Sequence, residues 1–333
     1  MDKDISVLFE PHTTAIHCNN KANDLLTVIV PCYNEEEVLP LFIDAISNVR
    51  AQLECCSELL FIDDGSSDGT LELLRSYSRS DSSVRYISFS RNFGKEAAIL
   101  AGLKNSKGNL CVLLDADLQH PPALIPEMYH ELRNGGYDSV AMYRNDRKKE
   151  GFLRRTFSSM FFKLLNKLSK INLINGATDF RMMTRPMTDA ILSLPESNRF
   201  SKGIFNWVGF NTKWLPFETA ERPAGESKWS FRKLLSYSMD AILGFSEVPL
   251  KLCSKVGIFF CIMAFLLGIF FFVKTLIFGD PVAGFPSLFI MLLMLGGIML
   301  CFLGILGLYI SRIYVEVKGR PAYLIKETEE KQE

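Results

Sequence analysis

Two long apolar stretches near the carboxyl end constrain the fold of this chain more than any other feature of its sequence. They run from Val256 to Phe278 and from Phe285 to Ile310, and both are almost free of charge. About twenty apolar residues are enough for a helix to cross a bilayer, so we expect two transmembrane helices. Lys274 lies close enough to the end of the first to reach the far surface. The alternative is a helical hairpin buried in a soluble core, although soluble helices are seldom apolar all round for this length.

Basic residues flank both stretches on one side, which predicts their orientation. The link from Gly279 to Gly284 carries only Asp280. Because cytoplasmic flanks are rich in lysine and arginine, we expect both termini in the cytoplasm and a multi-pass protein of the inner (plasma) membrane. Met1 to Asp24 lacks the apolar core of a signal peptide and is expected to be a disordered tail. The flanking residues are Arg232, Lys233, Lys251 and Lys255 before the first stretch, and Arg312, Lys318, Arg320 and Lys326 after the second.

The chain before these stretches alternates between strand and helix patterns. Such alternation predicts an α/β domain with a Rossmann-like, mostly parallel sheet, helices on both faces, and ligands beyond the carboxyl ends of the strands. The 37 basic and 37 acidic residues balance, so charge gives no reason to expect a nucleic acid. The expected strands are Leu25–Val30, Leu59–Ile62, Val84–Phe89, Leu110–Leu114 and Ser139–Met142, and the expected helices are Glu36–Leu53, Thr70–Tyr77, Lys95–Leu103 and Ala123–Leu132.

The predicted domain organisation follows from these patterns. The tail of residues 1–24 precedes a globular domain of residues 25–228, and the membrane region of residues 256–310 precedes a cytoplasmic tail of residues 311–333. Residues 229–255 form an amphipathic juxtamembrane segment with apolar residues at helical spacing up to Pro249, as expected for a helix lying among lipid headgroups. An internally packed helix is the alternative for this segment.

The segment LCVLLDADLQHPP, from Leu110 to Pro122, outlines a metal site. Its buried strand delivers Asp115 and Asp117, and Gln119 lies just beyond them. Carboxylate and amide oxygens at alternating positions can converge on one hard cation, Mg²⁺ or Mn²⁺, if the chain turns there. The alternative is a surface turn in which Asp115 caps the following helix.

Two earlier strand ends carry further candidates for ligand binding. In VPCYNEEE, Tyr33 offers a flat face to a planar base, and Glu35 either contacts the ligand or only favours the dipole of the next helix. In FIDDGSSDGT, Asp63 or Asp64 can accept a hydrogen bond from a uracil imide or a ribose hydroxyl. The chain has neither GxGxxG nor GxxxxGK[ST], so dinucleotide and P-loop functions lose their main support.

Five segments in this order resemble the polyprenyl-phosphate glycosyltransferases, which are family-two glycosyltransferases of GT-A fold. That group includes bacterial bactoprenol glucosyltransferases and dolichyl-phosphate mannose synthases. The resemblance covers about Leu25 to Leu252, and the paired apolar stretches look like those of the bacterial members. The segments are VPCYNEEE, FIDDGSSDGT, SFSRNFGKEAAILAGL, LLDADLQHPP and ERPAGESKWSFRKL.

The resemblance implies roles for individual residues. It implies that Asp115, Ala116, Asp117 and Gln119 hold metal and diphosphate, with Asp117 also a catalytic residue, and that Asp179, placed near the acceptor, is the candidate general base. Asp179 can instead orient the acceptor, because a phosphate monoester is already mostly ionised at neutral pH, and an N-cap or an ion pair with Arg181 is the other alternative. The implied nucleoside contacts are Pro31, Tyr33, Glu35, Ile62 and Asp64, and the implied phosphate contacts are Arg144, Arg222 and Lys228.

A basic run, YRNDRKKEGFLRR, follows the strand Ser139–Met142 on the ligand side of the sheet. Arginine suits phosphate through its fork of donors, so we expect Arg144 first, and Arg154 or Arg155 next, to hold the acceptor phosphate. An ordinary solvated charged surface is the alternative. Arg222 and Lys228 lie in a segment with Pro223 and Gly225 that can close over a bound diphosphate.

The sequence therefore predicts a membrane hexosyltransferase. The expected reaction moves glucose or a related hexose from a nucleotide diphosphate sugar, UDP-linked, to polyprenyl (undecaprenyl) phosphate with inversion, for modification of cell-envelope glycans. The expected partners are the donor, the lipid acceptor and the bilayer, and a homo-oligomer is left open. Two alternatives are a processive polysaccharide synthase, although QxxRW is absent, and a catalytically silent nucleotide-sugar-binding scaffold.

Overall fold

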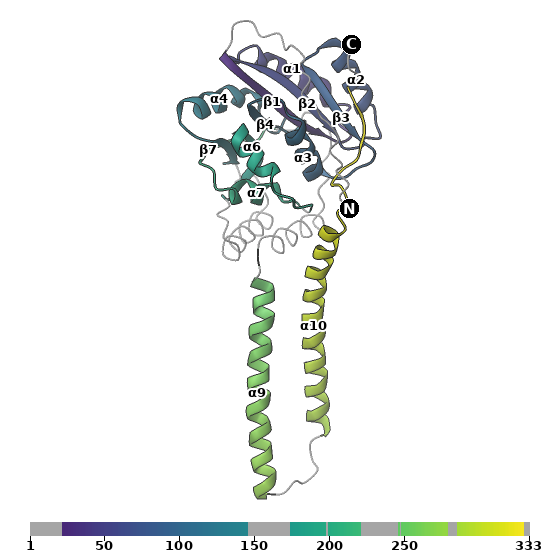
Figure 1. The fold of residues 1–333 in the computed structure, drawn as a ribbon, viewed down its shortest axis with the longest axis vertical. Coiled ribbons are helices and arrows are strands. Elements are labelled where there is room, and N and C mark those ends of the chain that lie inside the picture. The colour runs from purple at the N-terminus through teal and green to yellow at the C-terminus, as the bar shows by residue number, and fades with distance from the viewer. Residues whose placement is uncertain are drawn as a thin grey trace, which may run out of the picture.

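A computed structural model describes residues 22–145, 174–197, 199–220, 246, 248–278 and 285–329. An α/β domain lies at one end, and two long helices, α9 and α10, run side by side away from it (Figure 1).

The described residues form an eight-stranded mixed sheet in the order β7-β5-β6-β4-β1-β2-β3-β8. The block from β3 through β2 and β1 to β4 is parallel throughout, whereas β6 runs antiparallel to β4 and β5, and β8 antiparallel to β3. The strands before and after the long helices, β7 and β8, are the two outermost ones. The strands are β1 Ala22–Cys32, β2 Cys55–Asp63, β3 Val84–Phe89, β4 Leu110–Leu113, β5 Ser139–Arg144, β6 Ala177–Thr184, β7 Thr212–Phe217 and β8 Ile325–Thr328.

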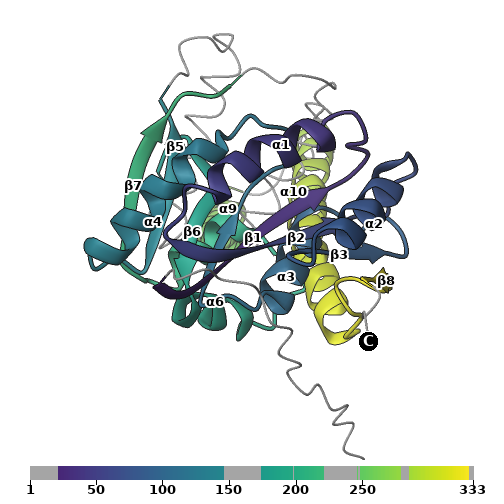
Figure 2. The same ribbon diagram turned by 90° about the horizontal axis from the view of Figure 1, so that it is seen from above.

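Helices cover both faces of the sheet, as the sequence predicted (Figure 2). One core joins the sheet to α1, α2 and α4, and a second joins the other face to α3, α6 and α7. Because both faces are covered, central strands read as continuous apolar runs, and Leu59 to Ile62 are at most 1% exposed. The helices are α1 Leu39–Arg50, α2 Thr70–Ser80, α3 Lys95–Asn105, α4 Ile125–Asn134 after a 3₁₀ turn at Pro122–Leu124, α6 Arg185–Leu192 and α7 Ser201–Trp207.

Helix α1 begins later than the sequence pattern predicted. It starts at Leu39, with Pro40 in its first turn, where the fixed φ of proline suits a helix. Glu36, the expected first helical residue, instead lies in the preceding turn and uses its carboxylate to accept a hydrogen bond from the Gly69 N–H at 2.8 Å. Glu36 therefore joins the loops that follow β1 and β2 and does not start the helix.

Helices α9 (Val248–Phe278) and α10 (Phe285–Val317) are each long and apolar enough to cross a membrane. Their apolar windows, Leu250–Leu267 and Met294–Val317, bury none of their residues against the rest of the described chain. Large apolar side chains such as Phe265 and Leu300 are about 70% exposed, at 69% and 71%. A hairpin buried in a soluble core, the alternative considered from the sequence, does not occur among these residues.

The segment after α10 returns to the sheet. Gly319, with φ of +61°, lies at the turn that ends the helix, and β8 then pairs antiparallel with β3. Near the start of β8 the Tyr323 ring stacks on Phe89 at 4.9 Å between centroids, and the Ser90 N–H donates to the Leu324 carbonyl at 3.0 Å. The sequence analysis predicted no strand in this tail.

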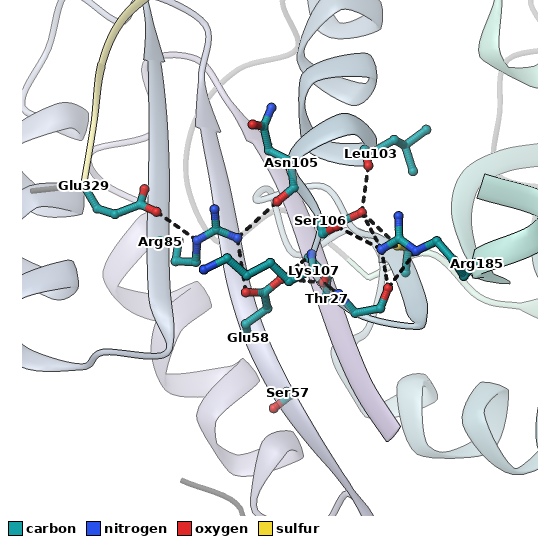
Figure 3. Close-up of polar contacts among 12 residues, drawn as sticks. Thr27, Ser57, Glu58, Arg85, Leu103, Asn105, Ser106, Lys107, Arg185 and Glu329 are labelled. Atoms are coloured by element: carbon teal, nitrogen blue, oxygen red, sulfur yellow. Dashed lines mark hydrogen bonds and ion pairs between the residues drawn. The ribbon is translucent and has the colours of Figure 1, made fainter. Parts of the chain in front are cut away.

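A polar network at the amino ends of the parallel strands ties this returning segment down (Figure 3). Arg85 of β3 donates to Glu329 just after β8 at 2.9 Å and to the buried Glu58 of β2 at 3.2 Å. Glu58 also accepts from the Thr27 hydroxyl at 2.6 Å and from the Lys107 N–H at 2.9 Å. Burial lowers the pKa of Arg85, but the two carboxylates outweigh that effect and raise it. The network therefore lies at the opposite end of the strands from the predicted ligand site.

Candidate active site

The loops after β1 and β2 are bound to each other where the first two motifs meet. Asn34 adopts a left-handed conformation, with φ of +54°, and its side-chain oxygen accepts from the Ser67 N–H at 2.8 Å. The Asn34 and Glu35 N–H groups donate in return to the hydroxyls of Ser66 and Thr70, at 2.9 and 2.8 Å. These bonds fix the backbone directly after Tyr33, a residue that is 37% exposed.

Two other expected nucleoside contacts flank this loop. Pro31 and Ile62 lie opposite each other in the register of β1 and β2. The Ile62 side chain is fully buried in the core beneath the sheet, so only its backbone can face a ligand. Their role in binding stays a prediction.

The paired acids of the second motif are both engaged in shaping loops. Asp63 is fully buried and accepts from the Ser88 hydroxyl at 2.6 Å and the Ser66 N–H at 3.0 Å. Asp64 accepts from the N–H groups of Phe93 and Gly94, at 2.6 and 2.9 Å, which fixes the loop leading into α3. Burial raises the pKa of Asp64, against the opposing effect of those two bonds. Each carboxylate oxygen retains a second lone pair, so a nucleoside contact by Asp64 remains compatible with this geometry.

The predicted metal motif turns sharply after β4. Leu118 has φ of +56°, an unfavourable conformation for a residue with a branched side chain. The turn allows the Gln119 N–H to donate to Asp117 at 3.1 Å, and Arg144 at the end of β5 donates to the Gln119 side-chain oxygen at 3.3 Å. Arg144, expected at the acceptor phosphate, thus lies beside the metal motif.

Lys95 is a site residue that the sequence analysis missed. Its ammonium contacts both oxygens of Asp115, at 2.7 and 2.8 Å, and Asp179 at 3.0 Å. Burial lowers the pKa of Lys95, but the two carboxylates outweigh that effect and raise it well above its usual value, so the side chain is charged. The ammonium of Lys95 therefore joins Asp115 of the metal motif to Asp179 of the acceptor motif. Only its position in the quoted segment SFSRNFGKEAAILAGL could have pointed to it.

Asp179 lies on β6, next to β4, which brings it to Asp115. Its ion-pair partner among the described residues is Lys95, whereas Arg181 packs over Phe205, with 4.3 Å from the guanidinium carbon to the ring centroid. Burial raises the pKa of Asp179, but Lys202 and Lys95 outweigh it and hold the pKa well below its usual range. A carboxylate this acidic is a weak base, which favours an orienting role.

His120 is a second residue that the sequence analysis missed, although it lies inside the LQHPP segment. It is 5% exposed and packs between Phe180 and Phe217, with 5.4 Å to each ring centroid. Its Nδ1 lies 3.5 Å from Asp115. Burial lowers its pKa, although Asp115 opposes the effect, so the ring is neutral at pH 7 and supports the metal motif by packing.

The residues present fit a hard divalent cation. Within the described part of the chain no group of three or more His, Cys, Asp or Glu side chains is placed to hold a metal ion by itself. The set predicted from the sequence, Asp115 and Asp117 with the amide oxygen of Gln119, supplies three oxygen-bearing side chains and stays a prediction. Asp115 is 25% exposed at its side chain and already contacts a positive charge. Oxygen ligands of this kind, with positions left for water and substrate phosphates, are those that Mg²⁺ and Mn²⁺ favour.

Four predicted phosphate contacts cannot be placed. Arg154, Arg155, Arg222 and Lys228 lie outside the described residues, as does the amphipathic pattern before Pro249. Their roles stay predictions.

The mixed sheet, with its acidic motifs at the carboxyl ends of β1, β2 and β4, is the GT-A fold of glycosyltransferases. The chain belongs to glycosyl transferase family 2, whose profile matches residues 27–192. It is therefore a glycosyltransferase, as the sequence predicted.

Relatives resemble it over nearly their whole length. A Bacillus subtilis protein named as a glycosyltransferase, CsbB, is 44% identical over 303 residues, 91% of this chain and 92% of the relative. The bactoprenol glucosyl transferase of Shigella phage SfII is 40% identical, over 91% of this chain and 98% of the relative. Among solved structures, glucosyl-3-phosphoglycerate synthase from Mycobacterium tuberculosis is similar with a TM-score of 0.46 and 19% identity, covering 66% of this chain and 78% of the other.

Proposed function

We propose that this chain transfers a hexose, glucose first among the candidates, from a UDP-linked sugar to the phosphate of a membrane polyprenol such as undecaprenol. The observation that carries the proposal lies at the carboxyl ends of β4 and β5. There Lys95 contacts both Asp115 and Asp179, and Arg144 donates to Gln119. Asp179 and Arg144, both expected at the acceptor, thus reach the metal motif separately, Asp179 by sharing the Lys95 ammonium with Asp115 and Arg144 by its bond to Gln119. Relatives named bactoprenol glucosyl transferases support glucose as the sugar and a bactoprenol lipid as the acceptor.

Transfer breaks the bond between the sugar C1 and the departing diphosphate oxygen, which keeps the electron pair. An oxygen of the acceptor phosphate forms the new bond to C1 from the opposite face, so the anomeric centre inverts. The acceptor phosphate, with a second pKa of about 6, is already mostly ionised at neutral pH and needs no base. This agrees with Asp179 orienting the acceptor.

The site must chiefly stabilise the negative charge that grows on the diphosphate. A divalent cation held by Asp115, Asp117 and Gln119 would neutralise part of that charge when bound. Arg144, beside Gln119, would hold the acceptor phosphate next to that site through its forked guanidinium donors. A cation held beside the departing diphosphate would favour the charge of the transition state over that of the bound donor.

Membrane attachment would bring the enzyme to its acceptor. Helices α9 and α10 are long and apolar enough to span a bilayer, and the basic residues beside them favour cytoplasmic termini. The α/β domain would then lie on the cytoplasmic side, where the lipid phosphate is held at the surface of the membrane.

The direct test supplies the purified full chain in lipid nanodiscs with UDP-glucose, undecaprenyl phosphate and Mg²⁺, and analyses the extracted lipid by mass spectrometry. One hexose per lipid, inverted relative to the donor, is the expected product. A ladder of hexoses would instead indicate a polysaccharide synthase. Nucleotide binding without any product, across a panel of sugar nucleotides, would indicate a silent scaffold.

A further inference from the structure

Lys95 occupies a place where its own helix does not favour a positive charge. It is the first residue of α3, and a helix N-terminus carries a partial positive charge that favours anions. The ammonium nevertheless lies there because Asp115 and Asp179 surround it, at 2.7 and 3.0 Å. The position of Lys95 therefore depends on the two carboxylates.

The backbone of Lys95 is fixed, whereas its side chain can move. Asp64 accepts from the Gly94 N–H at 2.9 Å, and Gly94 has φ of +98°, a conformation that a residue with a side chain would strain to adopt. The Lys95 side chain is 38% exposed and has four rotatable bonds, so the ammonium can leave Asp115 without any change in the helix.

From this geometry we infer that the Lys95 ammonium is an internal counter-ion that competes with the divalent cation for Asp115. The ammonium leaves Asp115 when the cation arrives together with the nucleotide diphosphate. The inference rests on the proposed function. A bare cation must displace the ammonium and leave it beside a second positive charge. With a diphosphate present, phosphate oxygens offer the ammonium new partners while Asp179 still holds it, so cation and nucleotide bind cooperatively.

Lys95 is in this sense a positioning residue, and its effect can be measured as a change in cation affinity without any transfer reaction. Lys95→Met removes the charge and keeps most of the length of the side chain. Lys95→Arg keeps the charge. Lys104→Met is the matched control, because Lys104 is an exposed lysine on the same helix, outside the site.

The experiment measures Mn²⁺ affinity of the purified full chain by electron paramagnetic resonance, with and without UDP. Without UDP, Lys95→Met is expected to bind Mn²⁺ at least tenfold more tightly than the unsubstituted chain, because a like charge has been removed from beside the cation. Lys95→Arg and Lys104→Met are expected to stay within twofold. UDP should raise Mn²⁺ affinity strongly in the unsubstituted chain and much less in Lys95→Met, and the converse effect of Mn²⁺ on UDP affinity should match.

Unchanged Mn²⁺ affinity in a folded Lys95→Met variant, verified by UDP binding, would overturn the inference while leaving the proposed function intact. Should that variant unfold, the unsubstituted chain still decides the matter, because Mn²⁺ binding that is equally tight with and without UDP contradicts competition by Lys95. Absence of Mn²⁺ binding even with UDP would overturn the proposed cation site and the inference together.

Discussion

Arg75 on α2 holds the carboxylate of Glu327 with two hydrogen bonds, of 2.9 and 2.8 Å, although the two residues are 252 positions apart in the chain. Glu327 belongs to β8, so this pair joins the strand that follows the membrane helices to the α/β domain. A paired guanidinium and carboxylate of this geometry is stronger and more specific in orientation than a single ion contact.

Loss of this pair should weaken the attachment of β8 by a modest amount. Both side chains are partly exposed, at 35% and 26%, so solvent screens the pair and we expect Arg75→Ala or Glu327→Ala to cost about 1 kcal/mol. Thermal melts of both single variants and the double variant at pH 7 would give the coupling between them. Fully additive losses would show that the pair contributes nothing.

The same pair should make the free energy of unfolding depend on pH in the acidic range. The bonds from Arg75 lower the pKa of Glu327, so the contribution is present above the unfolded pKa of about 4.3 and is lost as pH falls through the lower folded pKa. Between pH 7 and pH 3 the unsubstituted chain should therefore lose more stability than Glu327→Gln. Parallel pH profiles of the two melting temperatures would contradict this.

Asp64→Ala should reduce nucleotide affinity by more than tenfold. The substitution leaves the N–H groups of Phe93 and Gly94 without their acceptor, at about 1–3 kcal/mol each if they stay buried, and loosens the loop that carries Lys95. Calorimetric titration with UDP measures the loss. Asp68→Ala, in the same loop but facing Thr70, is the control and should retain most of the affinity.

Arg144→Ala should act mainly on the lipid acceptor. We expect a raised apparent KM for polyprenyl phosphate and UDP affinity within a few-fold of the unsubstituted chain, because the bond of 3.3 Å to Gln119 is a peripheral support of the metal motif. Initial rates at varied acceptor concentration test this. A loss of UDP binding equal to that of Asp64→Ala would merge the donor and acceptor sites.

Chelation should abolish transfer if Asp115, Asp117 and Gln119 hold a cation. EDTA should remove activity, and Mg²⁺ or Mn²⁺ in excess should restore it without refolding. Initial rates and a melting curve recorded on the same EDTA-treated sample would separate loss of the cation from loss of the fold. Full activity in excess chelator would exclude the metal role.

The parallel core was predictable because its signals are local. Strand β2, for example, shows the continuous apolar run of a strand covered on both faces, and acids follow it directly. An α/β sheet with its ligand motifs at the carboxyl ends of the strands follows from that pattern, whereas the GT-A fold was implied by the resemblance of the five motifs to a known family. The strand β8 was not predictable in this way, because Ile325 to Thr328 lie at an exposed sheet edge and contain no buried apolar run.

The missed site residues have partners that lie far away in the sequence. Lys95 reads as an ordinary charged residue at a helix start, and its partners are 20 and 84 positions away. His120 is buried by Phe180 and Phe217, which belong to strands β6 and β7 later in the sequence. Only the antiparallel placement of β6 beside β4 brings these groups together, and no local pattern specifies that pairing.

The two outermost strands of the sheet come from opposite sides of the long helices in the sequence, because β7 precedes α9 and β8 follows α10. With strands about 4.8 Å apart, the two strands are separated by ~34 Å across the sheet. A truncation before α9 therefore removes more than the two apolar helices. It also deletes β8 and leaves β3 as an unpaired edge strand, so the shortened domain would expose backbone N–H and C=O groups that the full chain covers.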